Sequence, residues 1–312
     1  MATGLELKVR EQIVMEHIRN PIEWSWDQVR LTGHAAESVG RAVRGAREYR
    51  HASLPIRRIG VADLGQALAH GFSDFGAFRT DVMFLCIFYP LAGLVLGYVT
   101  FGYNLLPLLF PLIAGFALIG PVAAVGLYEM SRRREQGLPT NWATAFSVLG
   151  SASFGAIAVL ALLLTAIFLI WLGVAWGIYA MTLGQIEPNQ VSTMQFMRDV
   201  LTTREGWWMI GIGMGVGFLF AVFVLTISVV SFPMLLDRDV GLLTAMRMSI
   251  RAVVQNPGPM ALWGLIVAAS LVIGSIPLFV GLIIVIPVLG HATWHLYRRL
   301  VPRYDLRWDR QA

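Results

Sequence analysis

Long, uninterrupted runs of apolar residues dominate the chain, and their spacing predicts membrane-spanning helices. About 20 consecutive apolar residues are needed to cross roughly 30 Å of hydrocarbon. A turn at Gly274–Pro277 separates the last two runs, so each of them has only the minimum length. The pattern predicts an all-α, polytopic transmembrane bundle with both termini on one side of the membrane. The six expected spans lie near residues 82–102, 105–128, 154–180, 207–232, 258–276 and 278–297.

The polar segments around these runs divide the chain further. Residues 1–60 are rich in charge and predict a cytoplasmic helical tail, residues 61–302 form the membrane domain, and residues 303–312 are a short cytoplasmic C-terminal tail. Residues 61–80 and 240–255 place small and apolar side chains on one helical face, which predicts amphipathic helices on the cytoplasmic leaflet. Their spacing corresponds at three pairs of positions, which are Ala67 with Ala245, Gly71 with Ser249 and Phe75 with Val253.

A second correspondence involves the prolines of the second and sixth spans. Pro121 and Pro287 are each followed, 11 and 12 residues later, by an arginine pair, Arg132–Arg133 and Arg298–Arg299. A unit of surface helix, hairpin of two spans, proline and arginine pair therefore occurs twice in the same orientation, as in membrane proteins built from parallel repeats. Each proline also frees a carbonyl one turn back, which predicts a kink, with a hinge as the alternative.

Composition and charge agree with a membrane protein and set its orientation. Hydrophobic residues make up 56% of the chain and charged residues only 14%, where soluble proteins average about 25% charged. Twenty-two of the 24 basic residues fall on one side of the expected spans, and only Arg198 and Arg204 fall on the other. The positive-inside tendency makes the richer side cytoplasmic. The net charge of +5 thus reflects topology and attraction to anionic lipid, not nucleic-acid binding.

Arginines and glycines are the residues expected to make lipid, partner and helix contacts. Arg132, Arg133, Arg134, Arg298 and Arg299 are candidates for contact with lipid headgroups or a partner, and the alternative is a snorkelling boundary cluster that fixes topology. Small residues four positions apart let helices approach closely. The candidates for helix packing are Gly93 with Gly97 and Gly211 with Gly215.

The positions of the ionisable residues argue against chemistry inside the membrane. All 19 acidic residues lie outside the span cores, with Asp81 and Glu129 at the boundaries. Pumps and ion-coupled transporters usually carry ionisable groups at depth, and an intramembrane hydrolase needs a base beside its serine. The sequence therefore predicts a non-enzymatic protein without catalytic residues. The single cysteine, Cys86, rules out a disulfide framework.

One pair of histidines leaves two interpretations open. His291 and His295 are one helical turn apart, where the last apolar run meets an arginine pair in "GHATWHLYRR". Two imidazoles at this spacing can share a metal, and one can ligate haem. Trp294 and Tyr297 around them are instead typical of an interfacial belt, where histidines bond to backbone or lipid. We expect no metal or cofactor, with haem or metal at this pair as the alternative.

Three stretches resemble an uncharacterised bacterial family of predicted integral membrane proteins, a domain family of unknown function. They are "GPVAAVGLYEMSRRREQG", "FPMLLDRDVGLLTAMRMSIRAVVQNP" and "GLIIVIPVLGHATWHLYRRLV", and the resemblance covers residues 57–302. Some members are labelled cytochrome c oxidase. A catalytic oxidase subunit ligates two haems and a copper, mostly through histidines in its spans. This chain has six histidines, of which only His291 and His295 fall in a span, so the label implies at most an accessory role.

These observations lead to two functional hypotheses. The first is a non-enzymatic protein of the bacterial inner membrane that serves as an accessory, scaffold or assembly component of a membrane complex. A terminal oxidase or another respiratory complex is the partner that the resemblance implies. The alternative is a transporter or lipid-handling protein built on the duplicated hairpin, with Pro121 and Pro287 as hinges.

Overall fold

The computed structural model describes residues 55–78, 106–185 and 192–302, together with five residues between Leu91 and Tyr98. All regular structure in these residues is helical, which confirms the all-α class. The tails 1–54 and 303–312 and most of the expected first span lie outside the described residues. The α-helices are α3 (Val61–Ala77), α6 (Leu109–Ala123), α7 (Val125–Glu135), α8 (Phe154–Met181), α9 (Thr193–Thr202), α10 (Arg204–Ser228), α11 (Ser231–Asp237), α12 (Leu242–Gln255), α13 (Pro257–Ser275) and α14 (Leu282–Leu300). Short 3₁₀ segments are η1 (Leu106–Leu108), η2 (Trp142–Gly150) and η3 (Leu183–Gln185).

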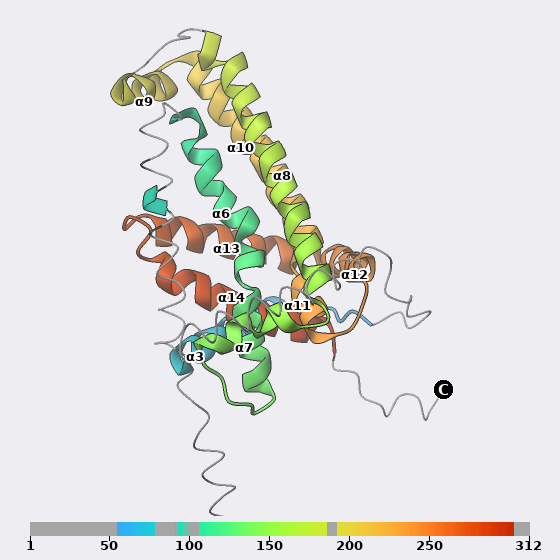
Figure 1. Cartoon of the computed structure of the whole chain (residues 1–312). Coiled ribbons are helices and arrows are strands. Elements are labelled where there is room, and N and C mark those ends of the chain that lie inside the picture. Colours follow the sequence, from blue (N-terminus) through green and yellow to red (C-terminus); the bar gives the residue numbers. More distant parts are fainter. Residues whose placement is uncertain are drawn as a thin grey trace, which may run out of the picture.

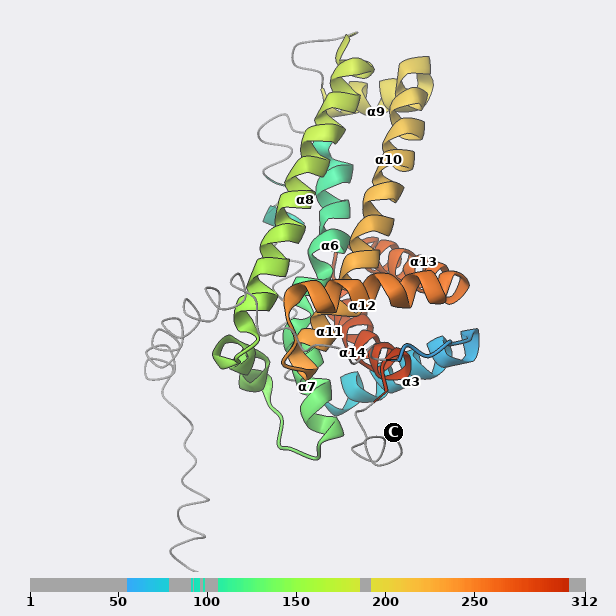
Figure 2. The same ribbon diagram turned by 90° about the vertical axis from the view of Figure 1, so that its right-hand side faces the viewer.

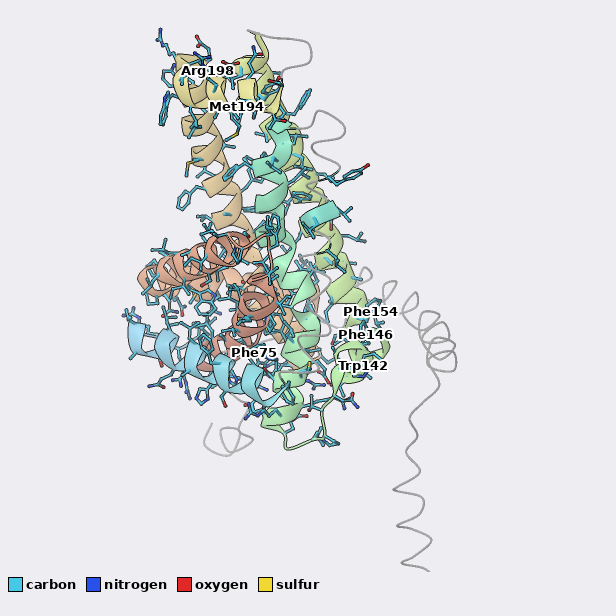
Figure 3. All side chains as sticks on the ribbon, turned by 90° about the vertical axis from the view of Figure 1, so that its left-hand side faces the viewer. Phe75, Trp142, Phe146, Phe154, Met194 and Arg198 are labelled. Carbon is cyan, nitrogen blue, oxygen red and sulfur yellow. The ribbon has the colours of Figure 1, made fainter. Side chains whose placement is uncertain are left out.

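Three helices, α6, α8 and α10, run side by side along the long direction of the molecule (Figures 1 and 2). α10 begins where the Thr203 side chain accepts a hydrogen bond from the Gly206 amide at 3.0 Å, which caps the helix in the ordinary way. α9 lies across their far end and carries Met194 and Arg198 (Figure 3). These helices form the elongated half of the molecule.

At the other end, α3, α7, α11 and α14 pack together into a unit that we call the platform. α3 and α14 form its most extensive contact. Gly71 permits this contact, because a Cβ atom there would lie 2.7 Å from the Val288 carbonyl oxygen and 2.8 Å from the Ala292 nitrogen. The large buried side chains of the platform include Trp294 and Phe232.

Both segments predicted to be surface helices are helical, as α3 (within 61–80) and α12 (within 240–255), and each turns its small residues inward. Ala67 and Gly71 are buried in α3, and Ala245 and Ser249 are buried in α12. The buried face of α3 packs on α14, whereas α12 packs on α10 and α11, where the Ser249 hydroxyl accepts a hydrogen bond from the Val230 amide at 3.2 Å. That the two helices lie on a membrane surface, and on its cytoplasmic side, stays a prediction.

Three described helices are long and apolar enough to cross a membrane, so the prediction of six spans is not confirmed. They are Phe154–Met181, Arg204–Asp237 (α10 continued by α11) and Pro257–Ser275. α6 has 15 residues and ends at Ala123, where the run expected near 105–128 breaks and α7 begins. α14, expected to be the sixth span, is not among the three. It buries 11 of its 19 residues and ends in an arginine pair.

The two prolines predicted to bend their helices occupy different settings. Pro121 lies inside α6, three residues before the break at Ala124 that separates α6 from α7. Pro287 is buried inside α14, which continues past it to Leu300. The second half of the expected repeat therefore does not reproduce the break found in the first half.

Candidate functional site

Five polar side chains from three platform helices meet around a buried carboxylate, and we call this group the polar junction. α3 supplies Asp74, α7 supplies Ser131 and Arg134, and α14 supplies His291 and His295. Asp74, Ser131 and His291 are buried. Helical spacing explains the arrangement, because Asp74 is one turn beyond Gly71 on the face that contacts α14, and the two histidines are one turn apart on α14.

Hydrogen bonds connect the polar junction into one chain. The Ser131 hydroxyl donates to Asp74 Oδ2, and His291 Nδ1 lies 2.8 Å from the same hydroxyl oxygen. Because the hydroxyl has only one proton and gives it to Asp74, His291 Nδ1 is the donor in this second contact. His295 Nε2 lies 2.9 Å from Asp74 Oδ2, and Arg134 donates from Nη1 to Asp74 Oδ1. Asp74 thus connects α3 to both α7 and α14.

Burial and charge in the junction set its protonation. Burial lowers the pKa of His291 to about 4, against the opposing effect of the Asp74 charge, so this imidazole is neutral at pH 7. Burial raises the pKa of Asp74, but the hydrogen bonds from His295 and Ser131, together with the electrostatic effect of the nearby imidazoles, outweigh it, and the pKa lies below its ordinary value. The junction holds a carboxylate beside a neutral histidine whose Nε2 has no hydrogen-bond partner among the described residues.

A second network joins α14 to α7 and α11 through Arg298. Its guanidinium donates two parallel hydrogen bonds of 2.7 Å to the Asp237 carboxylate and a third of 3.0 Å to Glu135. It also stacks over Trp294, 4.6 Å from the ring centroid, and the Tyr297 hydroxyl donates to Asp237 at 2.7 Å. Burial lowers the pKa of Arg298, but the charge of Asp237 and its hydrogen bonds outweigh this and raise it overall.

The other arginines singled out from the sequence also have partners within the chain. Arg132 and Arg133 both bond to the buried Glu129 on the same helix, at 2.7 and 2.9 Å. Arg299 bonds to Asp63 of α3 at 2.9 Å. The structure therefore places Arg132, Arg133, Arg134, Arg298 and Arg299 in internal ion pairs. Lipid or partner contact through these arginines stays a prediction.

Both histidines of the pair have hydrogen-bond partners within the polar junction. His291 bonds to Ser131 and His295 to Asp74, so the two rings are directed to different partners. Within the described part of the chain, no three His, Cys, Asp or Glu side chains converge as a metal site requires. His70 approaches His295 with ring centroids 5.0 Å apart. The geometry suits the orientation and stabilisation of helices, and the expectation about cofactors stays a prediction.

The packing glycines are placed in different environments. A Cβ atom on Gly93 would lie 2.8 Å from the Phe279 ring, so this position is a close contact. On Gly211 and Gly215 it would meet no described atom within 4 Å, whereas on Gly217 it would meet the Trp171 ring at 3.1 Å. Gly97 lies outside the described residues. Within the described part of the chain, α10 therefore approaches α8 at Gly217.

Sequence reasoning did not identify Asp74, Ser131, Glu135 or Asp237 as partners of the histidines and arginines. One signal was present, because Asp74 continues the small face formed by Ala67 and Gly71, and an acidic residue there predicts a buried partner. The other three give no such signal, since their partners lie on helices distant in sequence.

Residues 109–237, from α6 to α11, match the model of a family described as "Predicted integral membrane protein (DUF2189)". The match confirms the resemblance to an uncharacterised family of integral membrane proteins, and it says nothing of a cytochrome c oxidase. It is shorter than the range 57–302 expected from the sequence and excludes α3, α12, α13 and α14. No curated protein and no solved structure matches the chain.

Proposed function

We propose that this integral membrane protein is a non-enzymatic accessory or scaffold component of a larger membrane complex. The observation that carries the proposal is the use of acidic groups in the platform. Asp63, Asp74, Glu135 and Asp237 each bond to an arginine on a different helix, which fixes the helices relative to one another. Groups used in this way stabilise a rigid surface, whereas an acid–base catalyst must reach its substrate.

The outward face of α12 is the surface that we propose for contact with the complex. Leu243, Ile250 and Val254 are 66%, 39% and 69% exposed there, and Arg247 and Arg251 lie between them. Neither arginine forms an ion pair with a described residue. A face of exposed aliphatic side chains and exposed guanidinium groups suits a partner with an acidic, partly apolar surface.

We further propose that the platform faces the cytoplasm of a bacterial inner membrane, with both termini on that side. The arginine distribution supports this orientation, because Arg198 and Arg204 at the α9 end are the only basic residues assigned to the opposite side. A terminal oxidase complex is the first partner to examine, on the ground of the label that some members of the family carry.

The experiment is quantitative mass spectrometry of the full chain purified from its native membranes in a mild detergent. The double substitution Arg247→Glu with Arg251→Glu is compared with Arg198→Glu with Arg204→Glu, which changes the same number of charges at the α9 end. We expect the subunits of one membrane complex to co-purify in fixed stoichiometry and to fall at least about fivefold in the first variant only. A protein that purifies without stoichiometric partners would refute the proposal.

The second candidate is a transporter or lipid-handling protein, and one observation favours it. The three pairs of corresponding positions in α3 and α12 have matching burial: Ala67, Ala245, Gly71 and Ser249 are buried, and Phe75 and Val253 are half-buried. Such agreement is expected of an internal repeat. A specific solute or lipid that raises the Tm of the partner-free protein would support this candidate.

A further inference from the structure

The turn between α13 and α14 is built from exposed apolar residues. Ile276, Leu278 and Val280 are 75%, 71% and 56% exposed, and Ile273 at the end of α13 is 65% exposed. The sequence has no Asp, Glu, Lys or Arg between Arg251 and Arg298. A loop that projected into water would carry polar residues, so the turn is suited to an apolar surrounding.

Most backbone amides of this turn donate hydrogen bonds within the turn itself. The amides of Leu278, Phe279 and Val280 donate to the carbonyls of Ile276, Ser275 and Pro277, and the Leu282 amide donates to Phe279. Leu278 and Phe279 adopt positive φ angles of 49° and 65° to do so. Backbone that enters hydrocarbon must be satisfied internally, whereas backbone in water need not be.

Two observations support an intermediate depth for the turn in the bilayer. The Phe279 ring lies against Gly93, in the middle of the apolar run 82–102 and not at either end of it. α13 and α14 also run across the direction of α8 and α10 in both views (Figures 1 and 2). A hairpin of two spans would run along α8 and α10 and would place its turn at the level of α9.

We propose that α13 and α14 form a re-entrant hairpin that enters the bilayer from the platform side, turns at Ile276–Gly281 within the hydrocarbon, and returns to the platform. The occupant of its exposed apolar face is the acyl region of the lipid. α13 faces the lipid, and its aliphatic residues Leu265 and Val272 are 64% and 63% exposed. α14 lies between α13 and α3, with its polar residues in the platform. The termini stay on one side, as in the six-span arrangement, so a reporter at Ala312 does not distinguish the two.

The test is the reactivity of single cysteines in the full chain in its native membrane, with Cys86→Ser as the background. Leu278→Cys probes the turn, Met194→Cys probes α9 at the far end, and Leu138→Cys probes the loop after α7. Met194 and Leu138 are 79% and 49% exposed. Intact cells and inverted membrane vesicles are treated with a membrane-impermeant maleimide. The control residues are expected to react from opposite sides.

We expect Leu278→Cys to react from neither side, at a rate at least about tenfold below both controls, and to react fully after denaturation in detergent. Reaction from the Met194 side at the control rate would show two full spans and overturn the proposal. Reaction from the Leu138 side at the control rate would place the turn outside the bilayer and overturn it equally.

A nitroxide attached at the same cysteines gives a readout that does not depend on thiol reactivity. In lipid bilayers, oxygen is expected to accelerate the electron-spin relaxation of a nitroxide at position 278 more than a water-soluble nickel complex does, because oxygen concentrates in hydrocarbon. A ratio of the two effects no higher than that at position 194 would contradict the proposal. An unchanged Tm of each variant shows that the fold is retained.

Discussion

α13 and α14 follow one another along the chain, each has 19 residues, and both begin as apolar runs, yet they bury their surfaces differently. α13 buries three residues, Met260, Trp263 and Gly274. α14 buries 11, including a histidine, a tryptophan and a tyrosine. α13 is exposed along its aliphatic face, whereas α14 is enclosed by α3, α7 and α13.

The difference shows what stabilises each helix. Few side chains of α13 are buried against the rest of the protein. The position of α13 therefore depends on the lipid that surrounds it more than on contacts with other helices. α14 is held by close packing and by buried polar groups that are bonded to other helices, and a buried group left without its partner is costly. Mutations on the two helices should therefore have very different effects on the free energy of unfolding.

The largest effect is expected from Asp74→Ala, which removes the central acceptor of the polar junction. Ser131, His295 and Arg134 would lose their shared partner, and Ser131 and His295 would stay largely enclosed. We expect a loss of about 3–5 kcal/mol, the range for breaking a buried ion pair. Unfolding titrations in mixed detergent micelles measure it. Asp239→Ala, at an exposed carboxylate, is the control and should change stability by less than about 0.5 kcal/mol.

A direct comparison of the two helices uses one leucine from each. Leu296 of α14 is fully buried, so Leu296→Ala should cost about 2–5 kcal/mol through lost burial and the cavity left behind. Leu265 of α13 is 64% exposed, and Leu265→Ala should cost less than about 1 kcal/mol in detergent. The same titration measures both variants. Equal costs would contradict the distinction between an enclosed and a lipid-facing helix.

The contact of α3 with α14 can be tested with two glycines of one helix. A Cβ atom at position 71 collides with the α14 backbone, so Gly71→Ala should destabilise the protein by about 1–3 kcal/mol. A Cβ atom at position 65 meets nothing within 4 Å, so Gly65→Ala should stabilise it by up to about 1 kcal/mol through helix propensity. Changes of the same sign in thermal unfolding would show that α3 does not pack as described.

The smallest expected effect is a pH dependence that originates in His291. Its pKa is about 4 in the folded protein and 6.5 for the free side chain, so between these values only the unfolded chain binds the proton. Stability therefore falls as the pH decreases through this window, by on the order of 1 kcal/mol between pH 7 and pH 5. The lowered pKa of Asp74 adds to the loss only at lower pH.

Stability curves of wild type and His291→Gln between pH 5 and pH 7 measure this effect. The variant should show a flatter slope, whatever its absolute stability. Leu265→Ala, which removes no titratable group, serves as the control and should keep the wild-type slope. A wild-type slope in the His291 variant would assign the pH dependence to another group.

Much of the fold could be predicted from the sequence. Hydrophobic periodicity located α8, α10, α13, α3 and α12, because helices of this length depend on their own sequence of apolar and polar positions. The candidate site was predicted only in part. His291, His295 and the arginine pairs were recognised as a cluster at the end of α14 and α7, but their acidic partners on α3, α7 and α11 were not.

By itself, the sequence determined the helical class, the membrane character and the concentration of arginine at one end, since these depend on composition and on local spacing. Only the tertiary structure decided that the arginines are paired internally, that α14 is enclosed while α13 is exposed, and that α13 and α14 lie across α8 and α10. The physical reason is that hydropathy measures the cost of leaving water. It does not distinguish a helix that moves into lipid from one that moves into the interior of the protein, and that choice depends on partners from distant parts of the chain.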